Sequence, residues 1–396
     1  MKTLTRILIA LLAVLLLAAA VLQLTGHGYF WKALRYTYLQ GHNTAHIDDA
    51  RNFIQAPITG GPPQPWPAAA APRPLSDAMR QYLQTHRSAA FLVAHRGALV
   101  HESYFPPYGP DSRTNVFSMA KTVTTLLAGA AVADGLVPGF DAPLSTWVGE
   151  YAAHPQGRSA TLAQLSAMTA GHEWTENYYL PLNPTTELYF AGHAAATVLR
   201  HGFERAPGSG YEYSSASTQL LGIALQRALQ VREGGLTLAG YASRRLWQPL
   251  GLQDASWSLD APRERGGMEL AYCCIHTSAR NMARLGQLLL QEGQWNGRAV
   301  LPADFVRRMT SPNGQVDYYG HGLWMDPGHS PPFYFMQGHL GQYTIVVPSA
   351  QLVIVRLGQW RTKERGRHAV IPEEVYLYVQ EALALVGGPS KQAAGR

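Results

Sequence analysis

Two pairs of β-like runs, one toward each end of the chain, constrain the fold more than any other feature of the sequence. The first pair lies in residues 89–105, AAFLVAHRGALVHESYF, with Arg96-Gly97 as a turn signal between the runs. The second lies in residues 342–358, QYTIVVPSAQLVIVRLG, on either side of Pro348-Ser349-Ala350. The chain between the two pairs is rich in helical patches. We therefore predict an α+β fold: one antiparallel sheet built from both chain ends, flanked by helices, with an inserted helical subdomain.

Four segments carry helix signals. A cap-like pair, Ser76-Asp77, predicts a helix start just before the first strand. Residues 118–132 form an apolar helix that Asp134-Gly135 closes, and residues 219–230, QLLGIALQRALQ, have the apolar spacing of an amphipathic helix. The last helix begins at Pro372, a residue that suits a first helical position.

A positively charged N-terminus followed by an apolar run predicts a membrane-directed segment. Lys2 and Arg6 precede the apolar residues 7–22, which are slightly shorter than the roughly 20 residues of a spanning helix. Ala18-Ala19-Ala20 offers a cleavage site, so a cleaved signal and a secreted protein are the alternative. The length of the run and the aromatic residues beyond it favour an uncleaved anchor over residues 1–25. The basic N-terminus then directs the domain to the periplasmic side of the inner membrane.

Composition divides the rest of the chain into three parts. Residues 26–75 form a juxtamembrane segment and a spacer, with seven prolines between positions 57 and 74. Such a stretch cannot be a helix or a central strand and is typical of an extended spacer. Residues 76–386 contain the strand and helix patterns and form the folded domain. Residues 387–396 are predicted to be a disordered tail.

Charge and cysteine content exclude several classes of protein. The net charge of +6 favours anionic surroundings such as a membrane surface, but no dense basic run with interleaved aromatics occurs, which argues against a nucleic-acid partner. Cys273 and Cys274 are adjacent, and neighbouring residues rarely pair, so we expect no disulfide framework. The histidines lack the ligand spacing of a zinc site. We expect neither a metal nor an organic cofactor.

One lysine stands out because lysine is rare in this chain. Of the 32 basic residues, five are Lys and the remaining 27 are Arg. Lys121 follows Ser118 by three positions at the start of an apolar helix, so the two side chains share one face. A buried lysine can lose its proton, and a serine needs such a base to become a nucleophile. Free N–H groups at the helix N-terminus can stabilise an oxyanion.

The segment SMAKTVTTLLAGAAVADG resembles the active-site helix of the serine β-lactamase and penicillin-binding-protein superfamily, in its class C-like esterase and 6-aminohexanoate-dimer hydrolase branch. GYEYSSASTQLLG stands where that family has its Y-x-N motif, and LSAMTAG, LWQPLGL and ARNMARLGQLLLQEGQWNG are also similar. The resemblance covers roughly residues 88–385. It implies the β-lactamase/D,D-peptidase fold, with Ser118 as nucleophile, Lys121 as base and Tyr213 as proton relay. A phenol near a lysine ammonium should also be more acidic than a free one.

Two motifs depart from the family pattern. Ser215 replaces the Asn of Y-x-N, which in the family helps to hold the amide side chain of the substrate. In the third motif, FMQGHLGQYTIVVP, His339-Leu340-Gly341 matches H-x-G literally. Alternatively, Gly338 takes the place of the K-T-G glycine and the backbone N–H of His339 completes the oxyanion hole. We favour the second interpretation.

The loop HEWTENYY, residues 172–179, offers further candidates for the substrate site. Trp174, Glu176 and Tyr178 would suit a cleft wall, because the resemblance places a substrate-binding loop here. A loop that merely packs its aromatic residues is an equally good interpretation.

These features predict an envelope-facing serine hydrolase that cleaves esters, amides or peptides through an acyl-enzyme. A β-lactamase or D,D-peptidase is the first alternative, and a penicillin-binding-like protein without turnover is the second. The chain has no lysine between Lys121 and Lys363, so no K-T-G lysine exists. We therefore expect better turnover of neutral short esters than of β-lactams, unless Arg356 or Arg361 supplies the missing cation.

Overall fold

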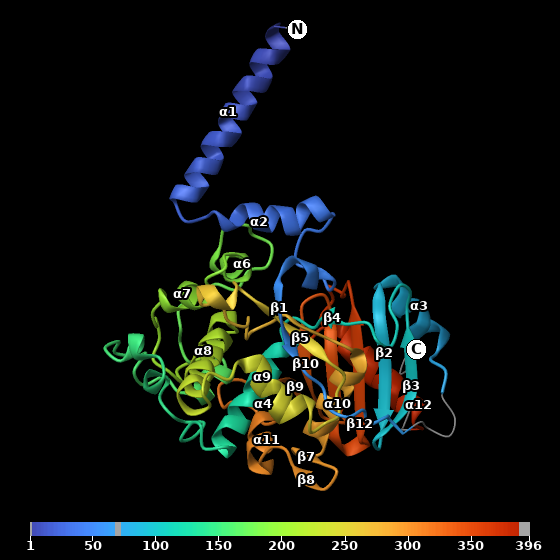
Figure 1. The fold of residues 1–396 in the computed structure, drawn as a ribbon. Helices are drawn as coiled ribbons and strands as arrows, with labels where there is room; N and C mark the ends of the chain where they lie inside the picture. Colours follow the sequence, from blue (N-terminus) through green and yellow to red (C-terminus); the bar gives the residue numbers. More distant parts are fainter. Residues whose placement is uncertain (1, 68–72, 388–396) are drawn as a thin grey trace.

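The computed structural model describes residues 2–67 and 73–387. Its main sheet has six antiparallel strands in the order β3-β2-β12-β11-β10-β9 (Figure 1). Strands from both chain ends meet at its centre, where Ile354 of β12 pairs with Val93 of β2. Both predicted hairpins and the predicted α+β fold are confirmed. The strands are β2 Ser88–His95, β3 Ala98–Tyr104, β9 Trp324–Asp326, β10 Phe333–Gly338, β11 Gln342–Val347 and β12 Leu352–Gly358.

Helices cover both faces of this sheet, as the alternation of side chains along a strand requires. On β2, Phe91 and Val93 pack in one cluster with α3 (Asp77–Thr85) and α12 (Glu373–Leu385). Leu92 lies in the other cluster with α4 (Met119–Ala133) and α10 (Ala279–Leu290). The predicted helix starts are confirmed, since Ser76 caps α3 and Pro372 precedes α12.

A helical subdomain is inserted between the two halves of the sheet. Its longest helix, α8 (Ser215–Arg232), packs on α4, α5 and α7. Residues 215–226 of α8 are buried on every side, so the expectation of an amphipathic helix is wrong: α8 is a core helix. The other helices of the domain are α5 Leu162–Ser166, α6 Pro184–Phe190, α7 Ala194–Leu199, α9 Leu238–Ala242 and α11 Ala303–Met309. Short 3-10 or π turns lie at Tyr38–Gln40, Asp49–Asn52, Leu144–Thr146, Gly149–Tyr151, Ser243–Trp247, Arg263–Arg265 and Pro348–Ala350.

A second sheet, of four strands in the order β1-β5-β6-β4, was not expected. Its edge strand β1 comes from the predicted juxtamembrane and spacer region and pairs with β5, where Pro57 lies opposite Ser256. Proline is tolerated there because an edge strand leaves one row of backbone groups unpaired. The folded domain therefore begins earlier in the chain than the proline content of this region suggests. These strands are β1 Ile54–Ile58, β4 Thr114–Asn115, β5 Ala255–Leu259 and β6 Ile275–Thr277; β7 Gln294–Trp295 and β8 Arg298–Ala299 form a separate hairpin.

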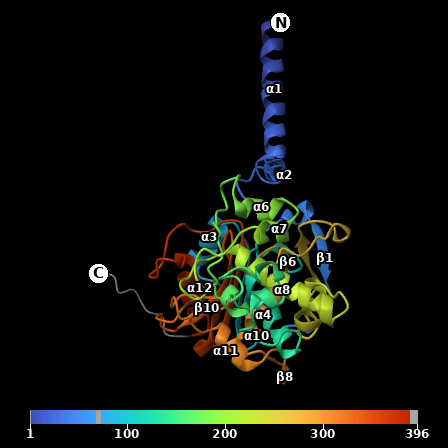
Figure 2. The same cartoon turned by 90° about the vertical axis from the view of Figure 1, so that its left-hand side faces the viewer.

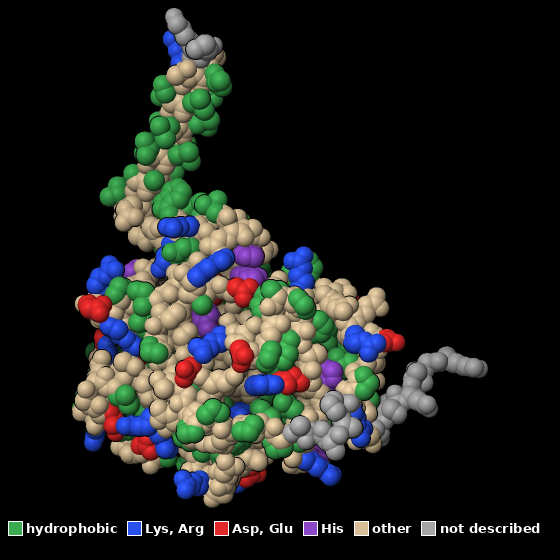
Figure 3. All heavy atoms as spheres, turned by 45° about the vertical axis from the view of Figure 1, so that its right-hand side comes forward, with side chains coloured by type: hydrophobic (Ala, Val, Ile, Leu, Met, Phe, Trp, Pro, Cys, Tyr) green, Lys and Arg blue, Asp and Glu red, His purple; other side chains and the backbone are tan. Residues whose placement is uncertain are grey.

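The N-terminal helix α1 (Lys2–Leu24) projects from the domain, and α2 (Tyr29–Tyr36) lies across the end of the domain beneath it (Figures 1 and 2). Hydrophobic side chains cover the length of α1 (Figure 3). Within the described residues, Thr3–Leu24 is the one stretch long and apolar enough to cross a membrane. Tyr29 and Ala33 of α2 pack against Phe190 of α6. The predicted disordered tail falls almost wholly in residues 388–396, outside the described part of the chain.

Candidate active site

Ser118 occupies the N-cap position of α4, at the end of a sharply turned backbone. Phe117 has a φ of +48°, a conformation that is unfavourable for a bulky residue, and its N–H donates to Asn115 Oδ1 at 2.8 Å. Lys121 lies one turn further along α4, and its Nζ donates to Ser118 Oγ at 3.0 Å. The predicted sharing of one helix face is confirmed.

Lys121 is surrounded by neutral acceptors. Besides Ser118, its Nζ donates to Ser215 Oγ at 3.1 Å and to the Tyr272 carbonyl at 3.1 Å. The side chain is buried, which disfavours the charged form and lowers its pKa to about 8, although the Glu176 carboxylate acts in the opposite direction. A minor fraction of Lys121 is therefore neutral near physiological pH and able to accept a proton.

The loop of residues 172–179 supplies a carboxylate directly to this cluster. Glu176 accepts from the Ser215 backbone N–H at 2.8 Å and from Ser215 Oγ at 2.6 Å. Trp174 Nε1 and Tyr178 OH donate to the same carboxylate at 2.9 and 2.6 Å. Ser215, at the position of the missing Asn, thus connects Glu176 to Lys121.

Tyr213 lies just before α8 with its ring 5.0 Å from Lys121 Nζ, and it lines the same pocket as Ser118. Burial raises the pKa of this phenol and the Glu176 carboxylate raises it further, whereas the neighbouring Ser118 hydroxyl and the charge of Arg361 only partly oppose them. The expectation of a more acidic phenol is therefore wrong, because desolvation outweighs neighbouring charge. With its pKa raised, Tyr213 stays protonated and can donate a proton.

The third motif lies at the end of β10, beside the start of α4. A side chain at Gly338 would come within 2.2 Å of the Val116 carbonyl, so this close approach of backbones requires glycine. Gly341 has a φ of +83° and forms part of the turn into β11. These positions favour the interpretation in which Gly338 is the glycine beside Ser118.

The His339 side chain is a neutral part of the wall. Burial, assisted by the charge of Arg361, lowers its pKa to about 3. Its Nε2 hydrogen-bonds Thr44 Oγ1 at 3.1 Å, and its ring meets the Phe117 ring edge-on. Thr44 belongs to the juxtamembrane segment, and no signal in the sequence pointed to this contact.

Two pockets of different character meet at Ser118. An apolar pocket extends toward α2 and α6, where it is lined by Ala33, Tyr38, Leu180, Pro181, Tyr189 and Phe190. A second, polar pocket is lined by Glu176, Tyr213, Trp324, Gln337, Arg361 and Arg365. Ser118, Tyr178 and His339 line both pockets.

The two arginines considered as replacements for the missing lysine have different surroundings. Arg356 is fully buried on β12 and donates to Ser88 Oγ and to the backbone carbonyls of His86, Leu340 and Gly341. Arg361 lines the polar pocket. Arg361, and not Arg356, is therefore the residue that can face a substrate.

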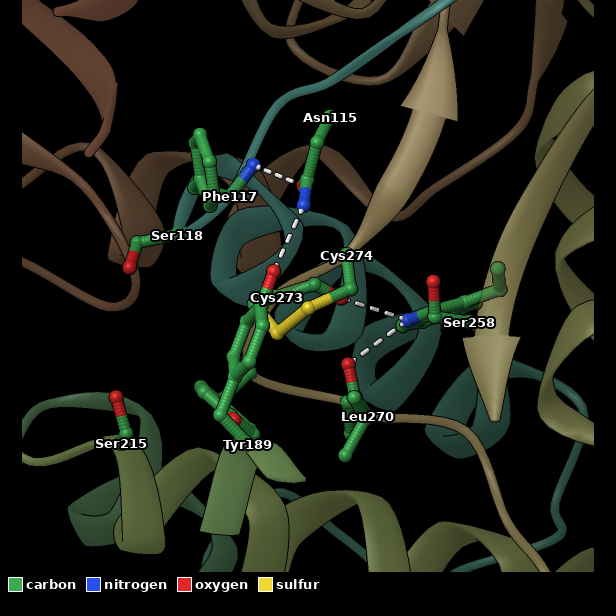
Figure 4. The surroundings of a disulfide bond; sticks show 12 residues. Asn115, Phe117, Ser118, Tyr189, Ser215, Ser258, Leu270, Cys273 and Cys274 are labelled. Atoms are coloured by element: carbon green, nitrogen blue, oxygen red, sulfur yellow. Dashed lines mark hydrogen bonds between the residues drawn. A yellow bond between two sulfur atoms is a disulfide. The ribbon is translucent and has the colours of Figure 1, made fainter. Parts of the chain in front are cut away.

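The adjacent cysteines form a disulfide, contrary to expectation (Figure 4). The pair lies in the turn before β6, which also carries the Tyr272 carbonyl that Lys121 contacts. Cys273 lines the apolar pocket, and Cys274 accepts from Ser258 of β5. The sequence did not predict this pairing because the rule applied there states only that disulfides between adjacent cysteines are rare. It does not take account of the conformation of this turn.

Within the described residues, no group of three or more His, Cys, Asp or Glu side chains is placed to hold a metal ion.

Comparison with known proteins gives consistent results. The sequence matches the family described as Beta-lactamase over residues 75–373. The 6-aminohexanoate-dimer hydrolase of Paenarthrobacter ureafaciens is 23% identical over 333 residues, which are 78% of this chain and 82% of that protein.

Solved structures show the same fold. The "Putative 6-aminohexanoate-dimer hydrolase from Bacillus anthracis" superposes with a TM-score of 0.74 at 22% identity, covering 91% of this chain and 95% of that chain. A family VIII carboxylesterase superposes with a TM-score of 0.58 at 17% identity, covering 78% of this chain and 95% of that chain.

Proposed function

Because the chain belongs to the beta-lactamase family and is a hydrolase of the serine type, we propose that it cleaves ester or amide bonds through an acyl-enzyme on Ser118. The observation that carries this proposal is the contact of Ser118 Oγ with a buried lysine whose pKa is lowered to about 8. A purely binding protein has no need of such a base, which argues against a penicillin-binding-like protein without turnover.

In the proposed reaction, Ser118 Oγ attacks the carbonyl carbon while Lys121 Nζ accepts the serine proton. Tyr213 then donates its proton to the leaving group and recovers one from Lys121, so that no net charge accumulates. The backbone N–H groups at the start of α4 and at His339 are the proposed oxyanion donors. Water releases the acyl group by the reverse sequence of proton transfers.

Replacement of the nucleophile tests this mechanism. Ser118→Ala should abolish both turnover of p-nitrophenyl butyrate and labelling by a fluorophosphonate, while the circular dichroism spectrum is retained. Ser112→Ala, at a partly exposed loop position outside both pockets, is the matched control and should be labelled normally. An adduct that maps to another serine would show that Ser118 is not the nucleophile.

Ester or amide hydrolysis is proposed in preference to β-lactam hydrolysis. Ser215 occupies the position of the motif Asn and contacts Lys121, and the strand that ends at Gly338 carries no lysine. Loss of one charge-assisted contact to a β-lactam carboxylate should cost at least ~10-fold in capture. We expect kcat/KM for p-nitrophenyl butyrate to exceed that for nitrocefin. The reverse order would favour a β-lactamase or D,D-peptidase that uses Arg361 as its cation.

We also propose that α1 is retained as a membrane anchor, with the domain on the periplasmic side. The helix is continuous through the small residues 18–20, and the following segment packs onto the domain through α2. The intact protein should pellet with membranes. Mass-spectrometric detection of a mature chain that begins near Val21 would instead show a cleaved signal.

A further inference from the structure

The two pockets at Ser118 receive different parts of a substrate. Departure of the leaving group requires a proton donor, and the donor proposed above, Tyr213, lines the polar pocket but not the apolar one. The leaving group must therefore lie in the polar pocket. The acyl part of the substrate then extends from Ser118 into the apolar pocket.

The apolar pocket is built by the part of the chain that leads to the membrane helix. Ala33 of α2 and Tyr38 form one wall, and Tyr189 and Phe190 of α6 form another. The pocket is narrow, with a cavity volume of about 80 Å³ apart from its open mouth. This value lies below the range of roughly 300–1,000 Å³ of small-molecule sites, so a long substrate chain must continue beyond the cavity through the open mouth.

Exposed apolar side chains surround the outer end of this pocket. Leu180 is 56% exposed and Tyr179 is 55% exposed, and both line the pocket. Leu39, next to the lining residue Tyr38, is 74% exposed, and Leu182 is 49% exposed. Such a cluster is costly in water but is stable against lipid.

The position of α1 indicates that this apolar cluster faces the lipid bilayer. Only residues 25–28 separate α1 from α2, and α2 contributes Ala33 to the pocket wall. Figure 1 shows α2 between α1 and the domain, so if α1 inserts into a bilayer, the pocket wall formed by α2 is held close to the membrane surface. The polar pocket, by contrast, carries the cations Arg361 and Arg365, with Glu176 as the opposing charge.

We propose that the substrate is a long-chain acyl ester drawn from the bilayer, with its acyl chain between α2 and α6 and a polar, anionic alcohol as leaving group. This inference rests on the proposed function of Ser118. The ester C–O bond breaks as the Ser118 Oγ–C bond forms, the alcohol leaves with the proton from Tyr213, and water then yields the free fatty acid and regenerates the serine hydroxyl.

Chain-length preference of the full-length protein in mixed micelles tests the acyl site. The kcat/KM for p-nitrophenyl laurate should exceed that for the acetate by at least ~10-fold, since each buried methylene contributes to capture. Leu180→Glu and Ala45→Phe, which charge and fill the pocket, should each lower this laurate-to-acetate ratio severalfold. Val231→Glu places the same charge on an exposed apolar residue outside the pocket and should leave the ratio unchanged.

Two further measurements test the leaving group and the source of the substrate. 1-Oleoyl-lysophosphatidylglycerol should be cleaved faster than 1-oleoylglycerol, and Arg361→Gln should reduce that preference. With the protein reconstituted in phosphatidylcholine vesicles, p-nitrophenyl palmitate in the same vesicles should be cleaved faster initially than in separate vesicles.

Three outcomes would overturn the inference: a flat chain-length profile, a preference for the uncharged glycerol ester, or equal rates from shared and separate vesicles. Each leaves the proposed serine hydrolase intact, provided that p-nitrophenyl acetate is still cleaved in a Ser118-dependent manner. Absence of all Ser118-dependent ester cleavage would instead overturn the proposed function itself.

Discussion

Two buried cations, at opposite sides of the third motif, show how differently this chain uses lysine and arginine. Lys121 on α4 and Arg356 on β12 are both almost completely inaccessible, with 1% and 0% of their surfaces exposed. Burial lowers the pKa of Lys121 to about 8, and the three acceptors that its Nζ contacts are neutral. A guanidinium cannot be deprotonated under such conditions, and Arg356 instead satisfies a set of backbone carbonyls.

Under the proposed mechanism, Lys121 transfers protons and Arg356 holds the backbone in position. Arg356 joins the turn at Leu340 and Gly341 to the start of β2, and so fixes the segment that carries His339 into the site. Lys121 contacts the candidate nucleophile directly. Replacement of Lys121 should therefore mainly reduce catalytic activity, whereas replacement of Arg356 should mainly reduce stability.

Lys121→Arg should produce the largest effect. An arginine keeps the positive charge but cannot accept a proton, so kcat/KM for p-nitrophenyl butyrate should fall by about 10²–10⁴-fold, the usual contribution of a general base. Lys363→Arg, at an exposed position, is the matched control and should retain activity. If Lys121→Arg retained a tenth of the activity, Lys121 would not act as the general base. The functional distinction between Lys121 and Arg356 would then be lost.

Arg356→Met should mainly lower stability. The substitution leaves several buried carbonyls without a donor, at about 1–3 kcal/mol each, so the free energy of unfolding should drop by at least ~3 kcal/mol. Urea unfolding in detergent measures this change. Arg308→Met breaks an exposed ion pair with Asp141 and should cost about 1 kcal/mol or less. Equal losses for the two variants would contradict a structural role for Arg356.

The pH dependence of kcat/KM tests the base itself. Since Lys121 must be neutral to accept a proton, kcat/KM should rise about tenfold per pH unit below pH ~8 and level off above it. The folded-state pKa of Lys121 lies below the ordinary lysine value of 10.5, so the unfolded chain binds more protons between these two values. The contribution of Lys121 to the free energy of unfolding should therefore increase from pH about 8 to about 10.5. A flat activity profile from pH 6 to 9 would exclude Lys121 as the titrating base.

Glu176→Gln should give the smallest effect, a shift of this pH profile. The carboxylate raises the pKa of Lys121 against the dominant effect of burial, so its removal should move the rising limb to lower pH. Glu173→Gln, on the same loop with a mostly exposed side chain, is the control and should leave the limb in place. A shift to higher pH in Glu176→Gln would show that the carboxylate does not act on Lys121 through its charge.

Local patterns predicted the elements that depend on neighbouring residues. The Arg96-Gly97 turn, the caps of α3 and α12, and the common face of Ser118 and Lys121 all follow from spacing within a few positions. The family resemblance then placed Tyr213 near the same cluster.

Local patterns did not predict contacts between residues that are far apart in the sequence. Glu176 and Ser215 are 39 positions apart, and Thr44 and His339 are 295 positions apart. Nothing in a short polar side chain indicates which remote group it will meet. The sign of the pKa change at Tyr213 was also wrong, because it depends on the extent of burial, which is a property of the whole fold.

The disulfide between Cys273 and Cys274 joins neighbours and therefore closes no loop of the unfolded chain. Crosslinks usually stabilise a protein by restricting the conformations of the denatured chain, and that effect requires residues that are far apart in sequence. Reduction should accordingly leave migration in a denaturing gel almost unchanged. A thiol count or an intact mass, compared before and after reduction, is the measurement that will reveal the state of this bond in a purified sample.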